Sequence, residues 1–324
     1  MEQQKFFEKP AEGQPWDIAI IGSGPSAFTA AIYTTRGAAS TLLLGGANWG
    51  GQLMLTTEVD NFPGFPEGIQ GPELMEKMRA QAERFMTEIK NEDVLEVDLS
   101  AKPFKLKTDS GEYIANTIIV ATGSATRWLG VPGEEKLRGR GVSSCAPCDA
   151  PFFKEKKVIV VGGGDSAMEE ALVLTKYASE VTVVHRRDSF KASQAMQQKV
   201  LDHEKIKVIW NAEVAEFVGE QKLERVKLKK TDGGEEEIEA DGAFVAVGHV
   251  PETDIFKGKL ELDEKGYMKK FEKDGFKTAT SVDGVFVAGD VHDYHYRQAI
   301  TAAGFGCMAG MDALKSLDKA PPSY

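Results

Sequence analysis

One pattern occurs twice in this sequence and limits the folds that the chain can adopt. Residues 17–27 read DIAIIGSGPSA, and residues 157–167 read KVIVVGGGDSA. Each copy is a short run rich in Ile and Val, followed by Gly-x-Gly-x-x-Ala and then by a helical pattern. Such a run is typical of a strand buried on both faces of a parallel sheet. We therefore predict an α/β fold with two dinucleotide-binding, Rossmann-like, three-layer domains.

The residue types in each copy suit a pyrophosphate. The first glycine permits a tight turn, the second lets the backbone approach the phosphates, and the small third residue lets helix and strand pack closely. The helix N-terminus adds free N–H groups and the positive end of its dipole. A single glycine-rich turn would be weak evidence, but two copies in a strand–turn–helix context are stronger. The positions are Gly22, Gly24 and Ala27 in the first copy, and Gly162, Gly164 and Ala167 in the second.

The residue about 20 positions after each glycine pattern selects the dinucleotide. After the second copy, the strand VTVVHRRD ends in His185, Arg186 and Arg187, and cations here suit the 2′-phosphate of NADP(H). A solvated basic strand end is the alternative interpretation. After the first copy, STLLLGG ends in Gly45 and Gly46, so the acidic ribose partner is missing and the pattern leaves the first ligand open.

Three later apolar runs indicate how the domains are arranged. The run AFVAVGHVP partners the second glycine loop much as TIIVATG partners the first, and GVFVAGD returns near the end of the chain. We predict a discontinuous domain, residues 1–126 and 254–324, with a second domain, residues 127–253, inserted into it. Gly and Pro punctuate the expected linkers near residues 127–128 and 249–253. Asp290, after the last run, could accept hydrogen bonds from a ribityl chain, although a lone Asp there is more often a helix N-cap.

Composition excludes several classes of partner. The chain has a formal net charge of −11, and an acidic chain repels phosphate backbones, so we expect no nucleic-acid partner. No apolar run approaches the roughly 18 residues of a membrane span. The stretch from Met1 to Trp16 is polar and lacks the apolar core of a signal peptide. We therefore expect a cytoplasmic protein with no membrane contact, in a compartment that keeps thiols reduced.

The three cysteines include one Cys-x-x-Cys pair, Cys145 and Cys148. Zinc would need two more ligands, and neither Cys307 nor the five histidines supply a matching spacing, so we expect no metal site. A redox-active dithiol needs only two sulfurs that form a reducible bridge, and Pro147 restricts the backbone between them. Asp149 could act as acid or base for a thiol. Asp149 as a turn residue or cap, and chance spacing of two buried cysteines, stay open as alternatives.

Two nucleotide sites and a dithiol together indicate a flow of electrons. A nicotinamide gives a hydride, a flavin can accept it, and a disulfide takes two electrons.

Eight stretches in a fixed order carry a family resemblance: IGSGPSAFTAAIY, GGQLMLTTEVDNFPGF, ATGSATRWLGVPGEE, GRGVSSCAPCDAPFF, GGGDSAMEEAL, HRRDSFKAS, VAVGHVPET and GVFVAGDVHDYHYRQAITAAGFGCMA. From about residue 17 to 316, the chain resembles the bacterial-type, low-molecular-weight thioredoxin reductases. The resemblance implies FAD in the discontinuous domain, NADPH in the inserted domain, thioredoxin as substrate and a homodimer. It also implies that Cys148 faces the flavin while Cys145 attacks the substrate disulfide.

The resemblance also implies which residues contact each cofactor. A Gly-Gly-Gln loop takes the place of the acid that is missing after the first glycine pattern. The implied FAD contacts are Gly22, Ser23, Gly24, Pro25, Ser26, Ala27, Gly50, Gly51, Gln52, Leu53, Asn61, Thr122, Gly123, Gly289, Asp290, Arg297, Gln298 and Ala299. The implied NADPH contacts are Gly163, Gly164, Asp165, Ser166, His185, Arg186, Arg187, Lys191 and Gly248.

Three features depart from the commonest family pattern. Cys-Ala-Pro-Cys-Asp-Ala replaces Cys-Ala-Thr-Cys-Asp-Gly, and we expect Pro147 to stiffen the pair and shift its potential. Lys191 stands where a second arginine is usual, and lysine lacks the bidentate fork, so affinity for the 2′-phosphate should fall modestly. His292, Tyr294 and His295 crowd the loop before Arg297, either as surface residues or with one aromatic near the flavin.

One mechanistic expectation follows from the domain assignment. The dithiol and the NADPH pattern share the inserted domain, and both must reach a flavin held by the other domain, so we expect the inserted domain to rotate between half-reactions. Reduction of another disulfide carrier, electron supply from ferredoxin, and a non-catalytic redox sensor are the alternatives. The intact GGGDSA and HRR motifs argue against ferredoxin, and the retained Cys145, Cys148 and Asp149 argue against a sensor.

Overall fold

The computed structural model describes residues 7–56 and 58–318. The chain divides into two compact units: unit 1 comprises residues 1–125 and 250–324, and unit 2 comprises residues 126–249. Residues 1–6 of the polar N-terminal stretch lie outside the described residues. Unit 2 is therefore inserted into the sequence of unit 1.

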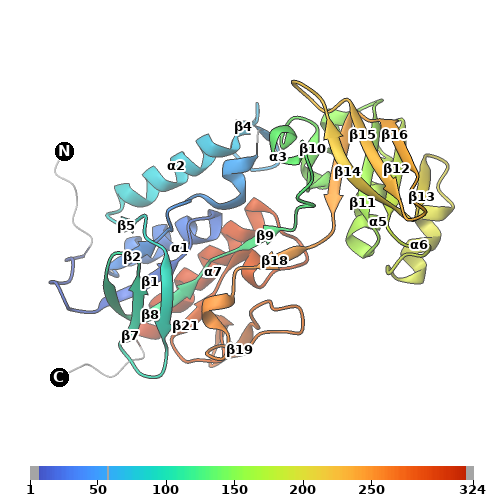
Figure 1. Cartoon of the computed structure of the whole chain (residues 1–324). Coiled ribbons are helices and arrows are strands. Elements are labelled where there is room, and N and C mark those ends of the chain that lie inside the picture. Colours follow the sequence, from blue (N-terminus) through green and yellow to red (C-terminus); the bar gives the residue numbers. More distant parts are fainter. Residues whose placement is uncertain (1–6, 57, 319–324) are drawn as a thin grey trace. The chain divides into compact units, whose positions relative to one another are not determined.

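Unit 1 is built on a nine-stranded sheet with the order β19-β20-β21-β8-β1-β2-β5, to which β6 and β7 are added beside β8. Its central strands are parallel, and β1, β2 and β8 are labelled in Figure 1. Strands β21, β8, β1, β2 and β5 run parallel to one another, while β20 pairs antiparallel with β21 and β7 pairs antiparallel with β8. The strands of this sheet are β1 (Trp16–Ile21), β2 (Thr41–Leu44), β5 (Glu88–Lys90), β6 (Val94–Asp98), β7 (Phe104–Thr108), β8 (Glu112–Val120), β19 (Phe271–Lys273), β20 (Phe276–Ala279) and β21 (Val285–Val287). Strands β3 (Glu58–Val59) and β4 (Ile69–Gln70) form a separate antiparallel pair.

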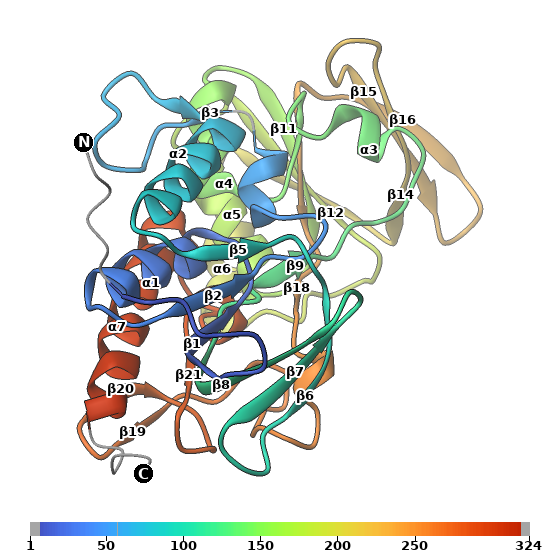
Figure 2. The same cartoon turned by 90° about the vertical axis from the view of Figure 1, so that its left-hand side faces the viewer.

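Buried apolar residues cover both faces of this sheet. Along β1, Ile18 and Ile20 point to one core and Ala19 and Ile21 to the other, because side chains alternate along a strand. Helices α1, α2 and α7 close the first core (Figure 2), and β6, β7 and residues 255–268 close the second. The helices of unit 1 are α1 (Pro25–Arg36), η1 (Gly51–Leu55), α2 (Gly71–Arg84), η3 (Asp254–Phe256), η4 (Gly289–Val291) and α7 (Ala299–Asp318).

Helices α1 and α7 approach each other closely because glycines line their contact. A Cβ on Gly306 would lie 2.1 Å from the carbonyl oxygen of Ser26, and one on Gly310 would lie 3.1 Å from that of Ala30. The distance at Gly306 excludes a Cβ, and the one at Gly310 would make a tight contact. The packing fixes α1, and with it the loop between β1 and α1.

Unit 2 repeats this three-layer plan at a smaller size. Its parallel sheet has the order β10-β17-β11-β12-β13, with α4, α5 and α6 on one core and the antiparallel sheet β14-β15-β16 on the other. The strands are β10 (Val142–Ser143), β11 (Lys157–Gly162), β12 (Glu180–His185), β13 (Ile206–Trp210), β14 (Ala212–Val218), β15 (Arg225–Lys230), β16 (Glu235–Glu239) and β17 (Gly242–Ala246). The helices are α3 (Glu134–Leu137), α4 (Ala146–Asp149), η2 (Ala150–Phe153), α5 (Asp165–Leu174) and α6 (Gln194–Leu201).

Two short strands mark the border between the units. Strand β9 (Ser124–Thr126) pairs with β18 (His249–Pro251) in a two-stranded sheet. The predicted α/β class with two Rossmann-like domains is confirmed.

Candidate nucleotide sites and redox dithiol

The first glycine loop follows β1 at the carboxyl edge of the unit 1 sheet. Gly22 has φ +122°, and a Cβ there would lie 2.2 Å from the carbonyl oxygen of Ala121, at the end of β8. Gly24 precedes α1, and a Cβ on it would meet nothing within 4 Å. The loop therefore packs tightly against its own sheet at the first glycine and is open at the second, which is the arrangement that a pyrophosphate needs.

Ser23 joins this loop to the Gly-Gly-Gln segment. Its hydroxyl donates to the carbonyl oxygen of Gly45 at 2.7 Å and accepts from the backbone N–H of Gly50 at 2.9 Å. Gly51, the next residue, lies against the first glycine loop, and a Cβ on it would be 3.6 Å from the Cα of Gly24. The segment after β2 thus lies on the first glycine loop, in the position where an acidic side chain would otherwise meet a ribose.

Segments distant in sequence meet at the same edge. A Cβ on Gly289, after β21, would lie 2.7 Å from Oγ of Ser26. The Nδ2 of Asn61 donates to Oε1 of Gln298 at 3.1 Å. These contacts bring Gly289 beside Ser26 and Gln298 beside Asn61, so residues from the two parts of unit 1 meet.

The other expected residues of unit 1 occupy defined positions around these contacts. Leu53 packs its side chain against the first core and Gln52 is exposed, both in η1. Thr122 donates from Oγ1 to the carbonyl oxygen of Glu252 at 2.7 Å. Gly123 has φ +74°, Arg297 has φ +48°, and Pro25 and Ala299 are the first residues of α1 and α7.

Asp290 has a buried carboxyl with a raised pKa. Its Oδ1 is buried and has no hydrogen-bond partner. Burial is the main cause that raises the pKa of its carboxyl to about 7; the neighbouring Asp293 charge adds to the rise, and the Arg297 charge opposes it. A buried acceptor without a donor is destabilising unless a ligand supplies one. The hydroxyls of a ribityl chain are such donors, so the residues at this edge fit a flavin.

Asp293 was not among the residues predicted from sequence, yet it organises the loop before α7. Its Oδ1 accepts the backbone N–H groups of His295 and Tyr296, each at 3.0 Å. His292 packs edge-on against Phe305, with ring centroids 4.4 Å apart, and burial lowers its pKa to about 4. An Asp two and three residues before the N–H groups it accepts is an Asx-turn signature, and this signal could have found it.

The second glycine loop follows β11 at the carboxyl edge of the unit 2 sheet. A Cβ on Gly162 would lie 2.4 Å from the carbonyl oxygen of Ala246, and one on Gly164 would meet nothing within 4 Å. The carbonyl oxygen of Gly163 accepts the N–H of Lys191 at 2.7 Å. Asp165 accepts from the N–H and hydroxyl of Ser193 at 2.9 and 2.8 Å. The structure therefore brings Lys191 to the loop, while the Asp165 carboxylate holds the neighbouring segment.

The basic strand end contains two kinds of residue. The His185 ring is buried against Phe190 and Trp210, with centroids 5.5 and 6.1 Å away, and its Nε2 lies 3.0 Å from the carbonyl oxygen of Ser189. Burial lowers the pKa of His185, and the two arginine charges lower it further. Arg186 and Arg187 are exposed. The positive charge at this edge therefore comes from the arginines and Lys191, and His185 is a neutral packing group at pH 7.

Gly248 and Ser166 complete the expected NADPH set. Gly248, with φ +111°, follows β17, the neighbour of β11. Ser166 lies in the first turn of α5. Both positions are at the same carboxyl edge.

The dithiol lies at this edge too. Strand β10 runs parallel to β17, with Ser143 opposite Phe244, so residues 144–149 leave the sheet on the side of the glycine loop. Cys145 and Cys148 form a disulfide with their Cα atoms 5.3 Å apart. Cys145 is the N-cap of α4, and Pro147 lies in its first turn. Burial raises the pKa of Asp149, and a hydrogen bond from Ser143 opposes that rise.

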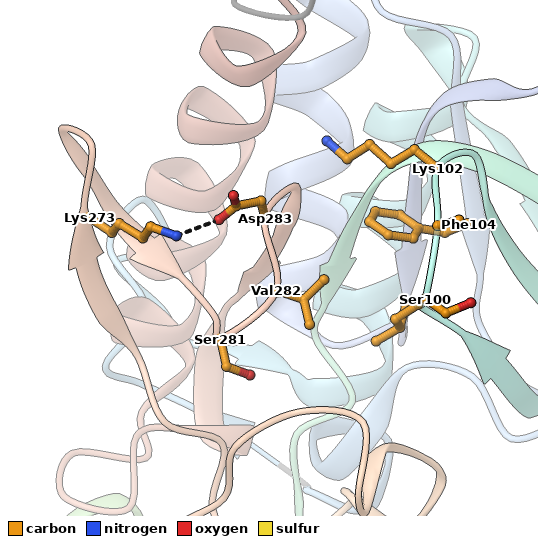
Figure 3. Close-up of a pocket in the computed structure, with 9 residues that line it drawn as sticks. Ser100, Lys102, Phe104, Lys273, Ser281, Val282 and Asp283 are labelled. Carbon is orange, nitrogen blue, oxygen red and sulfur yellow. Dashed lines mark hydrogen bonds and ion pairs between the residues drawn. The ribbon is translucent and has the colours of Figure 1, made fainter.

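A pocket of about 400 Å³ lies between residues 99–104 and 281–283, beside the Lys273–Asp283 ion pair of 2.7 Å (Figure 3). Its lining residues 281–283 come just before β21, so the pocket lies toward the amino ends of the parallel strands. Across residues 7–56 and 58–318, no group of three or more His, Cys, Asp or Glu residues is placed to hold a metal. None of the described helices has both the length and the apolar character of a bilayer-spanning segment.

Comparison with known proteins gives consistent matches over most of the chain. The family model for pyridine nucleotide-disulphide oxidoreductases matches residues 16–306. A thioredoxin reductase of Streptomyces coelicolor is 51% identical over an alignment of 316 residues, and the match covers 94% of this chain and 97% of that protein. One of Rickettsia conorii is 50% identical, covering 93% and 98%. The solved thioredoxin reductase from Giardia duodenalis has a TM-score of 0.89 at 42% identity, covering 94% of this chain and 100% of that one. The one from Streptococcus pyogenes has the same TM-score at 37% identity, covering 94% and 99%.

Proposed function

The chain belongs to the thioredoxin reductases, within the pyridine nucleotide-disulphide oxidoreductase family, and we propose on that premise that it is an NADPH-dependent, FAD-containing thioredoxin-disulfide reductase. The observation that carries this proposal is the Cys145–Cys148 disulfide at the sheet edge that also bears the second glycine loop. A structural zinc site would require both cysteines as metal ligands rather than bonded to each other. A disulfide beside a nucleotide loop suits electron transfer between the two.

We assign the two cofactors to the two units. FAD would lie on the carboxyl edge of unit 1, held by the first glycine loop, by the Gly50–Gly51 turn and by Asp290. NADPH would lie on the second glycine loop, with Arg186, Arg187 and Lys191 at its 2′-phosphate. When bound, FAD supplies the means to accept a hydride from NADPH and to deliver two electrons to a disulfide.

The residues of α4 would carry the exchange with the substrate. In the reduced enzyme, the Cys145 thiol loses its proton to solvent, and the thiolate attacks one sulfur of the thioredoxin disulfide; that S–S bond breaks, and the leaving thiolate takes a proton from solvent. Asp149 accepts the proton of the Cys148 thiol, and the Cys148 sulfur then attacks Cys145. This forms the Cys145–Cys148 bond and releases the second thioredoxin sulfur, which is protonated from Asp149. Thioredoxin gains two electrons and two protons, and the enzyme dithiol loses them.

Movement of unit 2 is part of the proposal. The dithiol and the NADPH loop lie in the same unit, and both must exchange electrons with a group held by unit 1. We infer that unit 2 rotates between two poses, one for each half-reaction, about β9 and β18. A cross-link that holds one pose should permit one half-reaction and block the other.

The proposal extends to assembly and compartment. Exposed apolar side chains gather on α1 and α7, where Tyr33, Ile300, Met308 and Met311 are each at least 38% exposed. Such a surface suits burial against a second copy, so we propose a homodimer through these helices. Light scattering should show a dimer that Met311→Glu weakens. We also propose the cytoplasm, because the dithiol must be returned to its reduced form at every turnover.

The first experiment is anaerobic reduction of the purified holoenzyme. NADPH should bleach the flavin absorbance, NADH should do so far more slowly, and oxidised thioredoxin should then restore it. Cys145→Ser should keep the bleaching and lose the recovery, which places the dithiol after the flavin. The matched control is Cys307→Ser, in the free cysteine of α7, and it should behave as the parent.

Each other outcome selects a different function. Bleaching without recovery would keep the nicotinamide and flavin half and point to another disulfide carrier. Bleaching by reduced ferredoxin but not by NADPH would mean a different electron donor. No turnover of any disulfide with excess NADPH would favour a redox sensor and would refute the proposed reductase.

A further inference from the structure

Ser143, which no part of the proposed reaction uses, makes two hydrogen bonds inside the redox motif. Its hydroxyl donates to Oδ2 of Asp149 at 2.5 Å, and it accepts the backbone N–H of Cys145 at 3.1 Å. Ser143 is 8% exposed and is the last residue of β10. One buried hydroxyl thus joins the acid–base residue to the cysteine expected to attack the substrate.

We propose that Ser143 is a positioning residue for the exchange reaction, holding the Asp149 carboxylate and the Cys145 backbone in one fixed relation. This inference rests on the proposed reductase function of the dithiol. A serine hydroxyl has one donor and two acceptor sites. Because the Cys145 N–H must be the donor toward Oγ, the hydroxyl hydrogen is left for the carboxylate. The Cys145 N–H therefore donates to Ser143, and the Ser143 hydroxyl donates to the Asp149 carboxylate. This chain of hydrogen bonds favours the ionised form of Asp149.

The sheet keeps this arrangement in place. Ser143 lies opposite Phe244 in the parallel pairing of β10 with β17, and Phe244 is fully buried. The backbone of Ser143 is therefore set by the core and not by the loop that carries the cysteines. Asp149 and Cys148 in turn donate their backbone N–H groups to the carbonyl oxygen of Cys145, at 3.1 and 3.2 Å. The short helix α4 is tied at both ends to the end of one buried strand.

The electrostatics around Asp149 support this role. Burial favours the protonated carboxyl and raises its pKa, and the Ser143 hydrogen bond is the effect that opposes burial. Helix α5 packs against α4 and carries the charged residues Asp165, Glu169 and Glu170. None of these three is a cause of the pKa shift of Asp149, which arises from burial and from the Ser143 hydrogen bond. Only the ionised carboxylate can accept the Cys148 proton. Loss of the hydroxyl should therefore move the acid limb of the exchange reaction to higher pH.

The test is the pH profile of a single turnover. NADPH-reduced holoenzyme is mixed anaerobically with oxidised thioredoxin, and oxidation of the dithiol is followed by rapid quench. In Ser143→Ala, we expect the acid limb to move up by about one pH unit or more, since a hydrogen bond to a charged group contributes about one to two pK units. The matched control is Ser144→Ala, because the Ser144 hydroxyl lies 3.2 Å from Oγ1 of Thr126 and not at Asp149. Its profile should match that of the parent.

A second pair of variants keeps the test valid if Ser143→Ala does not fold. Ser143→Thr keeps a hydroxyl, and the valine of Ser143→Val has nearly the shape of threonine but no hydroxyl. Comparison of these two variants therefore isolates the hydrogen bond. The threonine variant should restore the parent profile and the valine variant should not. Superimposable profiles for all folded variants would overturn the inference. Failure of the parent enzyme to reduce thioredoxin would instead refute the proposed function, and the two failures are therefore distinguishable.

Discussion

Asp290→Asn should stabilise the flavin-free protein and weaken its hold on FAD. The pKa of this carboxyl rises from 3.8 to about 7, mainly through burial. A difference of about 3 units corresponds to about 4 kcal/mol, at about 1.4 kcal/mol per unit. The charged form of Asp290 therefore opposes folding when no ligand donates to it.

The pH dependence has a definite sign. A carboxyl whose pKa is higher in the folded state binds a proton more tightly there, so stability is lost as the pH rises from the unfolded pKa to the folded one. The penalty is about 2 kcal/mol near pH 5 and reaches about 4 kcal/mol above pH 7, where it levels off. Asn cannot ionise, so the advantage of the variant should grow over this interval.

The assay is urea unfolding of apo-protein at about pH 5 and about pH 8, together with FAD titration by fluorescence. At the higher pH, the unfolding free energy of Asp290→Asn should exceed that of the parent by up to about 4 kcal/mol. FAD affinity should fall about 10- to 100-fold, because hydrogen bonds to a charged group contribute about 1.5–3 kcal/mol. Asp293→Ala is a contrasting variant. It should lower stability because its carboxylate accepts backbone N–H groups, and it should do so less at the higher pH because its charge raises the pKa of Asp290. Equal stability of Asp290→Asn and the parent at high pH, or a difference that does not change with pH, would refute this reasoning.

Three further predictions concern the packing of α1 on α7, the preference for NADPH, and a buried carboxylate of α3. Gly306→Ala would place a Cβ 2.1 Å from the Ser26 carbonyl oxygen, so we expect a loss of about 1–3 kcal/mol in urea unfolding; an unchanged midpoint would contradict the α1–α7 packing. Arg187→Gln should raise KM for NADPH but not for NADH, while His185→Phe should leave that preference intact because the ring is neutral and buried; the reverse pattern would show that His185 supplies charge. Glu134→Ala should destabilise the protein by about 2–3 kcal/mol in thermal unfolding, because it leaves two backbone N–H groups without the buried carboxylate that accepts them at 2.9 and 2.8 Å; a shift of less than 1 °C would be inconsistent with that role.

Features set by neighbouring residues could be predicted from the sequence. The two glycine loops depend on a strand, a turn and a helix that follow one another, so the pattern at Gly22 and at Gly162 was sufficient to predict both. The Cys145–Cys148 disulfide joins two residues one helical turn apart, and their spacing favoured a redox pair while leaving chance spacing open.

Features that need distant segments could not be predicted in the same way. The bond from Gly50 to the Ser23 hydroxyl joins residues on either side of α1 and β2, and no local pattern records it. Ser143 precedes the cysteines in a run of small residues, so its hydrogen bond to Asp149 is visible only in the folded chain. His185 ends a strand that resembles a basic patch, but its ring turns inward because Phe190 and Trp210 form an aromatic pocket beside it.

The border between the two units has a consequence for how this chain could have been assembled. The N–H of Arg127 donates to the carbonyl oxygen of Gly248 at 2.9 Å, so the two ends of the unit 2 sequence are hydrogen-bonded to each other. The N–H of Glu252 donates to the carbonyl oxygen of Gly123 at 3.0 Å, so the interruption of unit 1 is closed in the same manner. Within each unit, the two chain ends at the border therefore lie close together, and joining such ends by a short loop costs little conformational entropy. A nucleotide-binding module with adjacent ends can be gained, exchanged or removed as a cassette, and residues 126–249 have that property.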